Sequence, residues 1–410
     1  MRLLKLTSLY QQYIAAFYAS RPRLVNQSYA AQKEALDYDA FGWGDFWSHA
    51  LQPMGYEVME VSANVESLQK AWALENGAKF HPDTWRWDIA WAQVAAFQPD
   101  ILFMDDYSTF TYKWLLELRD ACPAISLILG WCGAPYQDAT VFKAYDLVLS
   151  CIPELVDHFR NQGHRSAHLN HAFEPRILTR LGAPTNPDID FSFIGSLNRG
   201  RDGHSKRERL LLELARRVDI KIFTPNLELG LKQNMKTMAK GALYQIIQGL
   251  RKAGVSSNLW SRIPKLGRAA RWNYRPMFSV HPRLRGRARP GVFGLEMYHT
   301  LQRSKLTFNS HIDISLNSAS NIRLFEATGI GTCLVTDWKE NLLKLFEPEK
   351  EVVTYQSAAE CVEKVKWLLD HLQERQAIGR AGQARTLRDH TFPLRALQLD
   401  DIIQKTIKKK

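Results

Sequence analysis

A chain of 410 residues is too long for one ordinary core and suits two domains. Its composition, 45% hydrophobic and 23% charged, excludes a disordered protein, and the lack of any run of about eighteen apolar residues argues against a membrane-spanning helix. The net charge of +12 comes from residues 231–290, which hold fourteen Lys and Arg and no acidic residue, so the rest of the chain carries −2.

The first half of the chain begins with an apolar run that predicts a buried strand rather than a signal peptide. Short apolar runs then alternate with amphipathic stretches. The runs predicted as strands are residues 3–6, 57–61, 101–104, 125–129 and 147–150. Strands separated by helical patterns predict a parallel sheet built from β-α units.

This rhythm breaks at residues 173–190, where three prolines and Gly182 predict a linker. It then resumes with predicted strands at residues 191–194, 220–223, 306–309, 333–336 and 352–355, and with predicted helices at residues 207–218, 323–328, 358–372 and 393–407.

The expected fold class is therefore α/β, with two Rossmann-like doubly wound domains that face a cleft. We place the first domain at residues 1–174 and the second at residues 188–390. The basic segment 231–290 would be an insertion in the second domain. Residues 391–410 would form a C-terminal helix and a basic tail.

The most informative stretch is residues 317–337, where polar residues precede a short helix that Gly329 and Gly331 end before an apolar strand. The N-terminus of a helix offers free backbone N–H groups to a phosphate. Arg323 would add a charge-assisted contact, and Glu326 could accept hydrogen bonds from two ribose hydroxyls. An ordinary Arg–Glu pair three residues apart on a helix fits the same spacing.

Several stretches in this order resemble the C-terminal domain of CgeB-like glycosyltransferases of the GT-B group 1 superfamily. They are Asn309-Ser310-His311-Ile312-Asp313, residues 321–329, Thr336-Asp337, residues 351–355 and His390-Thr391-Phe392. The resemblance is close over residues 291–396, looser over residues 191–209, and limited to the rhythm of strands and helices in the N-terminal half.

The resemblance implies that the C-terminal domain holds a nucleotide-sugar donor. Glu326 would grip the nucleotide ribose, Asn321 and Arg323 would lie beside the diphosphate, and Asn309 would belong to the same donor site. Many relatives carry a second glutamate eight positions earlier, where this chain has Ser318. That departure leaves sugar recognition and stereochemistry open.

Gly195 and Ser196 close the first predicted strand of the second domain. Glycine lets a backbone approach a phosphate, and cations neutralise it. Among the cations that follow, Arg209 has the best placement by resemblance, whereas Arg199 and Arg201 also suit a solvated loop. His311 follows the strand at residues 306–309, where it could contact a phosphate or a sugar hydroxyl or cap a turn.

Asp105 and Asp106 follow the strand at residues 101–104, so they should face the cleft. A carboxylate there could be the general base for an acceptor hydroxyl in an inverting transfer. A retaining transfer needs no such base, and helix capping also fits these residues. The pair alone makes no metal site, and the resemblance implies that none is required.

The leading hypothesis is sugar transfer from a nucleoside-diphosphate sugar to a hydroxyl of a glycan, lipid-linked or protein acceptor, in surface-polysaccharide or glycoconjugate synthesis. It needs no cofactor or metal. The alternatives are a nucleic-acid-binding or nucleic-acid-modifying protein, which the basic segment suggests without a recognition motif, and a non-catalytic GT-B scaffold that binds glycans.

The expected location is the cytoplasm, because the five scattered cysteines form no Cys-x-x-Cys pair, disulfide framework or zinc site. The basic segment adds a candidate contact with an anionic membrane, at its inner face, or with another polyanion.

Overall fold

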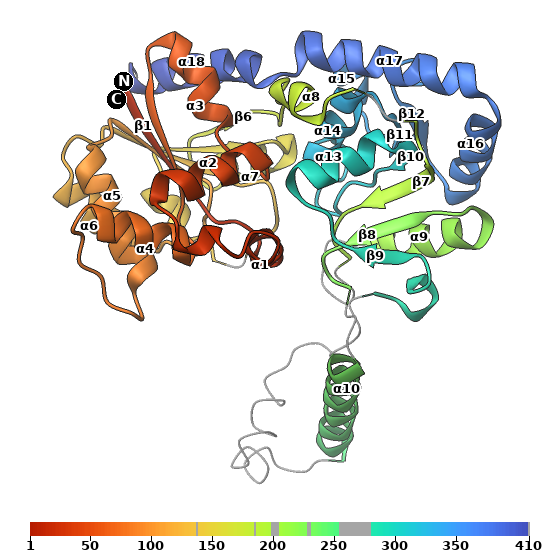
Figure 1. The fold of residues 1–410 in the computed structure, drawn as a ribbon, viewed down its shortest axis with the longest axis horizontal. Coiled ribbons are helices and arrows are strands. Elements are labelled where there is room, and N and C mark those ends of the chain that lie inside the picture. Colours follow the sequence, from red (N-terminus) through yellow and green to blue (C-terminus); the bar gives the residue numbers. More distant parts are fainter. Residues whose placement is uncertain (137, 184–185, 198–204, 228–230, 254–279, 409–410) are drawn as a thin grey trace.

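The computed structural model describes residues 1–136, 138–183, 186–197, 205–227, 231–253 and 280–408 (Figure 1). Arg199, Arg201 and the central part of the basic segment, residues 254–279, lie outside these ranges. Within the described residues no helix is both long and apolar enough to cross a bilayer.

The N-terminal half is built on a six-stranded parallel sheet in the order β2-β1-β3-β4-β5-β6. Its strands are β1 (Arg2–Thr7), β2 (Glu57–Ser62), β3 (Ile101–Met104), β4 (Leu127–Trp131), β5 (Leu147–Ser150) and β6 (Ser166–His168). Every residue of β3, β4 and β5 is buried, as expected for parallel strands covered by helices on both faces.

Seven α-helices accompany this sheet in the described chain. They are α1 (Gln11–Ala19), α2 (Tyr29–Asp39), α3 (Phe46–Leu51), α4 (Glu66–Glu75), α5 (Trp85–Phe97), α6 (Tyr112–Ala121) and α7 (Pro153–Asn161). Their ends follow local chemistry: the Ser28 side chain caps α2, and the Thr111 hydroxyl accepts a hydrogen bond from the Trp114 amide at the start of α6.

The C-terminal half repeats the design with a second six-stranded parallel sheet in the order β12-β11-β10-β7-β8-β9. Its strands are β7 (Ile189–Ile194), β8 (Lys221–Thr224), β9 (Ala288–Pro290), β10 (Ser304–Phe308), β11 (Cys333–Asp337) and β12 (Val353–Tyr355). Its helices are α8 (Arg176–Leu181), α9 (Ser205–Arg217), α10 (Leu231–Lys252), α13 (Gly294–Gln302), α14 (Ile322–Ile330), α15 (Leu342–Leu345), α16 (Ala358–Asp370) and α17 (Leu372–Asp389).

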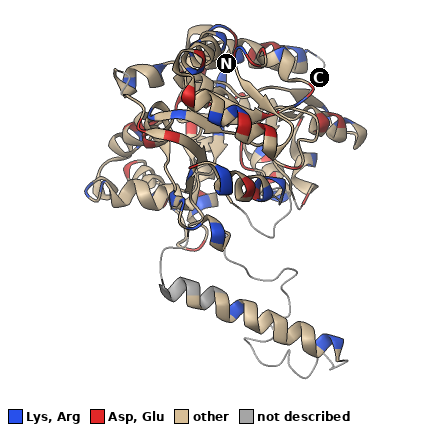
Figure 2. Cartoon of the chain, turned by 90° about the vertical axis from the view of Figure 1, so that its right-hand side faces the viewer, with Lys and Arg blue, Asp and Glu red and all other residues tan. Residues whose placement is uncertain are grey.

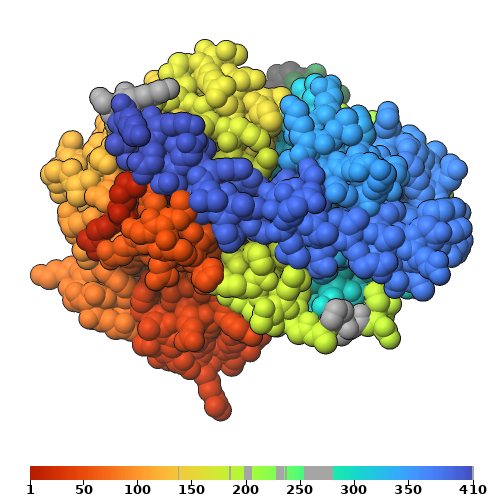
Figure 3. All heavy atoms as spheres, turned by 90° about the horizontal axis from the view of Figure 1, so that it is seen from above, coloured from red at the N-terminus to blue at the C-terminus, as the bar shows by residue number. Residues whose placement is uncertain are grey.

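The last helix, α18 (Phe392–Ile407), returns to the N-terminal half, and Figure 3 shows it crossing the boundary between the two halves. Its first residue, Phe392, packs edge-on against Phe46 and Trp47 of α3. Farther along, the Tyr56 hydroxyl donates a 2.5 Å hydrogen bond to Asp400. The chain therefore connects the halves twice, before β7 and before α18.

The two connections run side by side. The Phe173 amide donates to the carbonyl of His390 at 2.8 Å, and the Phe392 amide donates to the carbonyl of Phe173 at 3.0 Å. A Cβ on Gly329 of α14 would lie only 2.3 Å from the Phe173 ring, so this glycine allows α14 to pack against the first connection. These contacts fix α14 relative to the path between the halves.

Charges are distributed unevenly over the described surface. Both signs are interspersed on the two sheet-containing halves, whereas α10, which stands apart from them, shows Lys and Arg but no acidic residue (Figure 2). The basic character inferred for residues 231–290 is thus carried in part by a separate helix.

Candidate functional site

Each sheet has one point where the strand order reverses, and the candidate residues lie there. In the first sheet the reversal falls between β1 and β3, which Ser8 and the pair Asp105-Asp106 follow. In the second it falls between β7 and β10, which Gly195 and Asn309 follow. Ligands bind at the carboxyl ends of parallel strands at such points, because the loops diverge there.

The Asp105 carboxyl is partly exposed and lies next to the buried ammonium group of Lys5. Its Oδ2 accepts a 2.8 Å hydrogen bond from the Thr7 hydroxyl and lies 3.8 Å from Lys5 Nζ, and 19% of its side chain is exposed. Burial raises the pKa of Asp105 to about 6, although Lys5 and Thr7 act in the opposite direction. This carboxyl therefore titrates close to neutrality, as suits a general base.

Lys5, in the middle of β1, supplies the positive charge next to Asp105. Its ammonium lies 3.2 Å from Glu60 on β2, with both side chains almost fully buried, and 5.0 Å from the centre of the Trp43 ring. The Ser48 amide donates a 2.8 Å hydrogen bond to the other oxygen of Glu60. One cation is thus shared between two carboxylates, which fixes the position of Asp105.

Asp106 is engaged in its own loop. Its Oδ1 accepts from the amide and hydroxyl of Ser108, both at 2.8 Å, and from the Thr109 amide at 3.0 Å, while Oδ2 accepts from the Ser8 hydroxyl. Burial raises the pKa of Asp106, but these hydrogen bonds outweigh burial and hold it below its usual value. Its contacts cap a turn of the loop at residues 106–109, whereas helix α6 is capped by Thr111 and not by Asp106.

We expect Asp106→Ala to lower the free energy of unfolding by about 2–4 kcal/mol, because several hydrogen bonds to a carboxylate are lost together. Since the pKa is depressed in the folded state, the contribution is present above about pH 4 and is lost as the pH falls below it. Urea unfolding at pH 7 measures the difference. A variant as stable as the wild type would contradict the capping role.

Tyr10, just after β1, was not among the residues predicted from the sequence. It is 59% exposed, and its ring meets Phe41 edge-on at 5.7 Å. Enclosure by the surrounding groups raises the pKa of its hydroxyl, the charges of Asp105 and Glu326 raise it further, and Arg323 lowers it. Tyr10 follows β1 and therefore lies beside the reversal point of the first sheet.

The start of α14 is fixed by a pair of asparagines. The Asn321 side chain caps the helix by accepting from the Leu324 amide, and it exchanges two hydrogen bonds with Asn309, at 2.7 and 3.2 Å. Asn309 also donates to the Thr336 hydroxyl at 2.9 Å. The two side chains are therefore committed to each other, and they hold the N-terminus of α14 at the end of β10.

Glu326 and Arg323, one turn apart on α14, form an ion pair of 2.8 Å, and the Tyr298 hydroxyl donates a 3.2 Å hydrogen bond to Glu326. The glutamate is 5% exposed. The ion pair joins Glu326 Oε2 to Nη1 of Arg323, but Oε2 accepts no hydrogen bond from a described residue, and the Nε of Arg323 is buried without a hydrogen-bond partner among them. The intrahelical pair that the sequence allowed is present, and it leaves unused hydrogen-bonding capacity on both members.

His311, after β10, is oriented by Asp337 at the end of β11. Its amide and its Nδ1 both lie near Asp337 Oδ1, at 3.0 and 2.7 Å. Burial raises the pKa of Asp337, but His311 and Lys339 outweigh burial and hold the pKa low. The other ring nitrogen of His311, Nε2, is buried with no partner in the described chain. Asp337 thus fixes the ring and leaves Nε2 available.

The cation that joins the ends of β7 and β10 is Arg207. This buried residue donates to the Ser196 carbonyl at 3.3 Å and to the Ser310 carbonyl at 2.6 Å. Arg209, the residue favoured from the sequence, lies two positions farther along α9 with its side chain exposed. The preceding strand end is crowded, since a Cβ on Gly195 would lie 2.9 Å from the Phe193 ring.

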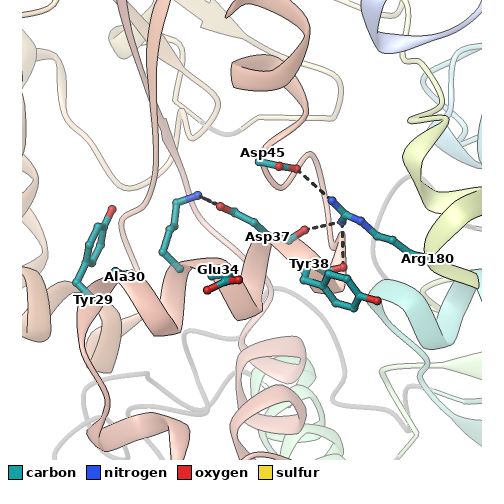
Figure 4. A pocket seen from close by; sticks show the side chains of 8 residues that line it. Tyr29, Ala30, Glu34, Asp37, Tyr38, Asp45 and Arg180 are labelled. Carbon is teal, nitrogen blue, oxygen red and sulfur yellow. Dashed lines mark hydrogen bonds and ion pairs between the residues drawn. The ribbon is translucent and has the colours of Figure 1, made fainter.

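No cluster of three or more His, Cys, Asp or Glu side chains with the geometry of a metal site occurs in the described ranges. An open pocket of about 450 Å³ lies elsewhere, between α2 and α8 (Figure 4). Its charged groups satisfy one another: Lys33 pairs with Asp37, and Arg180 donates to the carbonyls of Asp37 and Tyr38 at 2.8 and 3.0 Å. This pocket holds none of the predicted site residues.

Comparison with known proteins agrees with this geometry. Residues 244–401 match a family model described as glycosyl transferase-like. No curated protein sequence matches the chain.

Three similar solved structures extend the comparison to the whole chain. Sucrose-phosphate synthase from Thermosynechococcus elongatus has a TM-score of 0.52 at 10% identity, with 100% of both chains covered. A glycosyltransferase from Rickettsia africae has a TM-score of 0.53 at 9% identity, covering 100% of this chain and 99% of its own. HepE from Anabaena, in complex with UDP and glucose, has a TM-score of 0.50 at 11% identity, covering 99% and 100%. The predicted fold class is confirmed: the chain has the two-domain α/β architecture of GT-B glycosyltransferases, with a glycosyl transferase-like match in its C-terminal part.

Proposed function

We propose that the chain is a glycosyltransferase of the CgeB-like kind, which moves a sugar from a nucleoside diphosphate to an acceptor hydroxyl. The observation that carries the proposal is that the partly exposed carboxyl of Asp105 lies at the reversal point of one sheet, while the Arg323–Glu326 pair lies on α14, which is anchored at the reversal point of the other. A donor site and a base on opposite walls are what a transfer between two bound substrates needs, because orientation removes much of the barrier.

On the donor side, the first turn of α14 offers backbone N–H groups to the diphosphate, and Arg323 adds a charge once the donor competes with Glu326 for its guanidinium. In this proposal Glu326 accepts hydrogen bonds from the ribose hydroxyls through Oε2, which is ion-paired with Arg323 but accepts no hydrogen bond from a described residue. His311 Nε2 lies at the neighbouring strand end. Because Nδ1 donates to Asp337, Nε2 would accept from a sugar hydroxyl when the ring is neutral and donate to a phosphate when it is protonated.

On the acceptor side, Asp105 would accept the proton of the attacking hydroxyl. The acceptor oxygen forms a bond to the anomeric carbon, the bond from that carbon to the diphosphate oxygen breaks, and the nucleoside diphosphate leaves with the electron pair. This inverting sequence needs no cofactor and no metal. Enclosure of Asp105 raises its pKa toward the working range, which favours the proton transfer.

We place the reaction in the cytoplasm, in the synthesis of a surface polysaccharide or another glycoconjugate. All five cysteines are buried and free, as suits a reducing compartment. The acceptor hydroxyl would belong to a glycan, a lipid-linked saccharide or a protein.

A thermal-shift series with UDP, GDP, TDP and CDP tests the donor site. At a free concentration about 100 times its Kd, the correct nucleotide should stabilise the folded chain by about 2.7 kcal/mol, because it binds the native state alone. We expect one of the four to raise the melting temperature clearly more than the corresponding nucleoside does. No response to any diphosphate would contradict a nucleotide-sugar enzyme, whereas binding without turnover of the donor would indicate a non-catalytic scaffold.

A further inference from the structure

Helix α10 stands apart from both sheets (Figures 1 and 2) and is inserted between β8 and β9 at the edge of the second sheet. Three large apolar side chains on it are exposed: Met235 by 69%, Met238 by 64% and Ile246 by 58%. Exposure of single apolar residues is common, but three on one projecting helix form a feature that needs an explanation.

These side chains lie on one face. At about 100° per residue, positions 235, 238, 242, 246 and 249 fall within a narrow stripe along the helix. Ala242 and Gly249 within that stripe are exposed as well. Ile247, which points about 100° away from Ile246, is fully buried. The buried position Ile247 therefore lies outside the exposed stripe.

The charge around the stripe has one sign. Lys240, Arg251 and Lys252 lie on α10 outside the stripe and are exposed. Residues 231–290 contain fourteen Lys and Arg and no Asp or Glu. Long cationic side chains can extend their charged ends toward headgroups while their stems cover apolar surface. An apolar stripe bordered only by cations complements a surface whose outer layer is anionic and whose interior is apolar.

We propose that α10 lies in the interface of an anionic phospholipid bilayer, with Met235, Met238 and Ile246 among the acyl chains and the cations among the headgroups. Helices with this distribution bind in the plane of the interface, through buried apolar area and electrostatic attraction together. A nucleic acid would use the cations and leave the apolar stripe in water. The inference goes beyond sugar transfer, since it concerns where the protein resides rather than what it binds as donor.

Co-sedimentation of the full chain with phosphatidylcholine vesicles, with and without phosphatidylserine, tests the proposal. The wild type should sediment with anionic vesicles, less with neutral ones, and less as salt is raised, because screening shortens the reach of the charges. Met238→Asp/Ile246→Asp should lower the partition coefficient at least about tenfold, since two apolar side chains lose their burial. Gln248→Asp, at a partly exposed position about 120° from the centre of the stripe, adds a negative charge and should retain most of the binding.

Three outcomes would overturn the proposal. The wild type could fail to sediment with anionic vesicles, or Gln248→Asp could lose as much binding as the double variant. The double variant could also bind as well as the wild type while salt alone releases both, which would indicate a polyanion site without insertion. Nucleotide thermal shifts of the same variants should match the wild type, so failure of membrane binding and failure of the donor site are distinguishable.

Discussion

Replacing Glu326 by alanine is expected to weaken nucleoside-diphosphate binding by about two to four orders of magnitude. In the proposed complex this carboxylate accepts hydrogen bonds from two ribose hydroxyls. Each hydrogen bond to a charged group contributes about 1.5–3 kcal/mol of binding free energy. The change also removes the partner of Arg323, which lies 2.8 Å away, and leaves a largely buried guanidinium unpaired. Isothermal titration calorimetry with the nucleotide found in the thermal-shift series measures the loss.

Two further variants separate the ribose contact from a general loss of structure. Glu326→Gln keeps the shape and one good acceptor, so it should lose less affinity than Glu326→Ala while folding normally. Glu363→Ala removes an exposed carboxylate on α16 and should bind like the wild type. Wild-type affinity in both Glu326 variants would show that the Arg323–Glu326 pair serves the helix alone.

The buried strands could be predicted from the sequence because each is a short apolar run. Two strands were missed, β6 and β9, and both are three-residue edge strands without an apolar run: Ser166–His168 and Ala288–Pro290. Such strands form because a neighbouring edge offers hydrogen bonds, which is a tertiary property. Their pairing with β5 and β8 therefore becomes visible only once the sheets are assembled.

Helix α17 (Leu372–Asp389) was missed for a different reason. Its Gly379 and Gly382 weaken any helical pattern read from the sequence alone. In the structure both glycines permit close packing: a Cβ on Gly379 would lie 2.4 Å from the Gly331 carbonyl oxygen, and one on Gly382 would lie 2.4 Å from that of Glu351. Glycine lowers the helix propensity at these two positions, but close contact between α17 and the neighbouring backbone requires it.

Site residues at the ends of strands could be predicted from the sequence. Site residues whose position depends on contacts between distant parts of the chain could not. Asp105 and His311 follow predicted strands and Asn309 ends one, and the structure places them at the reversal points. Tyr10 has no local signal, because it lies beside the reversal point only once β1 is paired with β3.

Whether Arg207 or Arg209 reaches the strand ends depends on which face of α9 each side chain occupies. Two residues apart on a helix lie about 200° apart, so one side chain faces the strand ends and the other faces solvent. Both arginines belong to the same basic run, and composition alone does not say which of them is buried.

Asp105→Asn is expected to lower the rate of transfer by about 10²- to 10⁴-fold, the usual contribution of a general base, and to leave nucleotide affinity unchanged. Asparagine retains an acceptor for the Thr7 hydroxyl, which donates to Asp105 at 2.8 Å, so the loop should keep its conformation. Asp106→Asn serves as the matched control, because its carboxylate is occupied by Ser8, Ser108 and Thr109. The rate constants are compared under saturating donor and acceptor.

The pH profile gives this prediction a second, independent readout. A base works in its deprotonated form, and burial raises the pKa of Asp105 to about 6. The wild-type rate should therefore rise as the pH increases through about 6 and level off above it, and Asp105→Asn should lack this rise. If the variant keeps the wild-type rate and profile, and NMR shows that the product retains the donor's anomeric configuration, the hydroxyl is not deprotonated by Asp105. Asp105 would then position the acceptor rather than accept its proton.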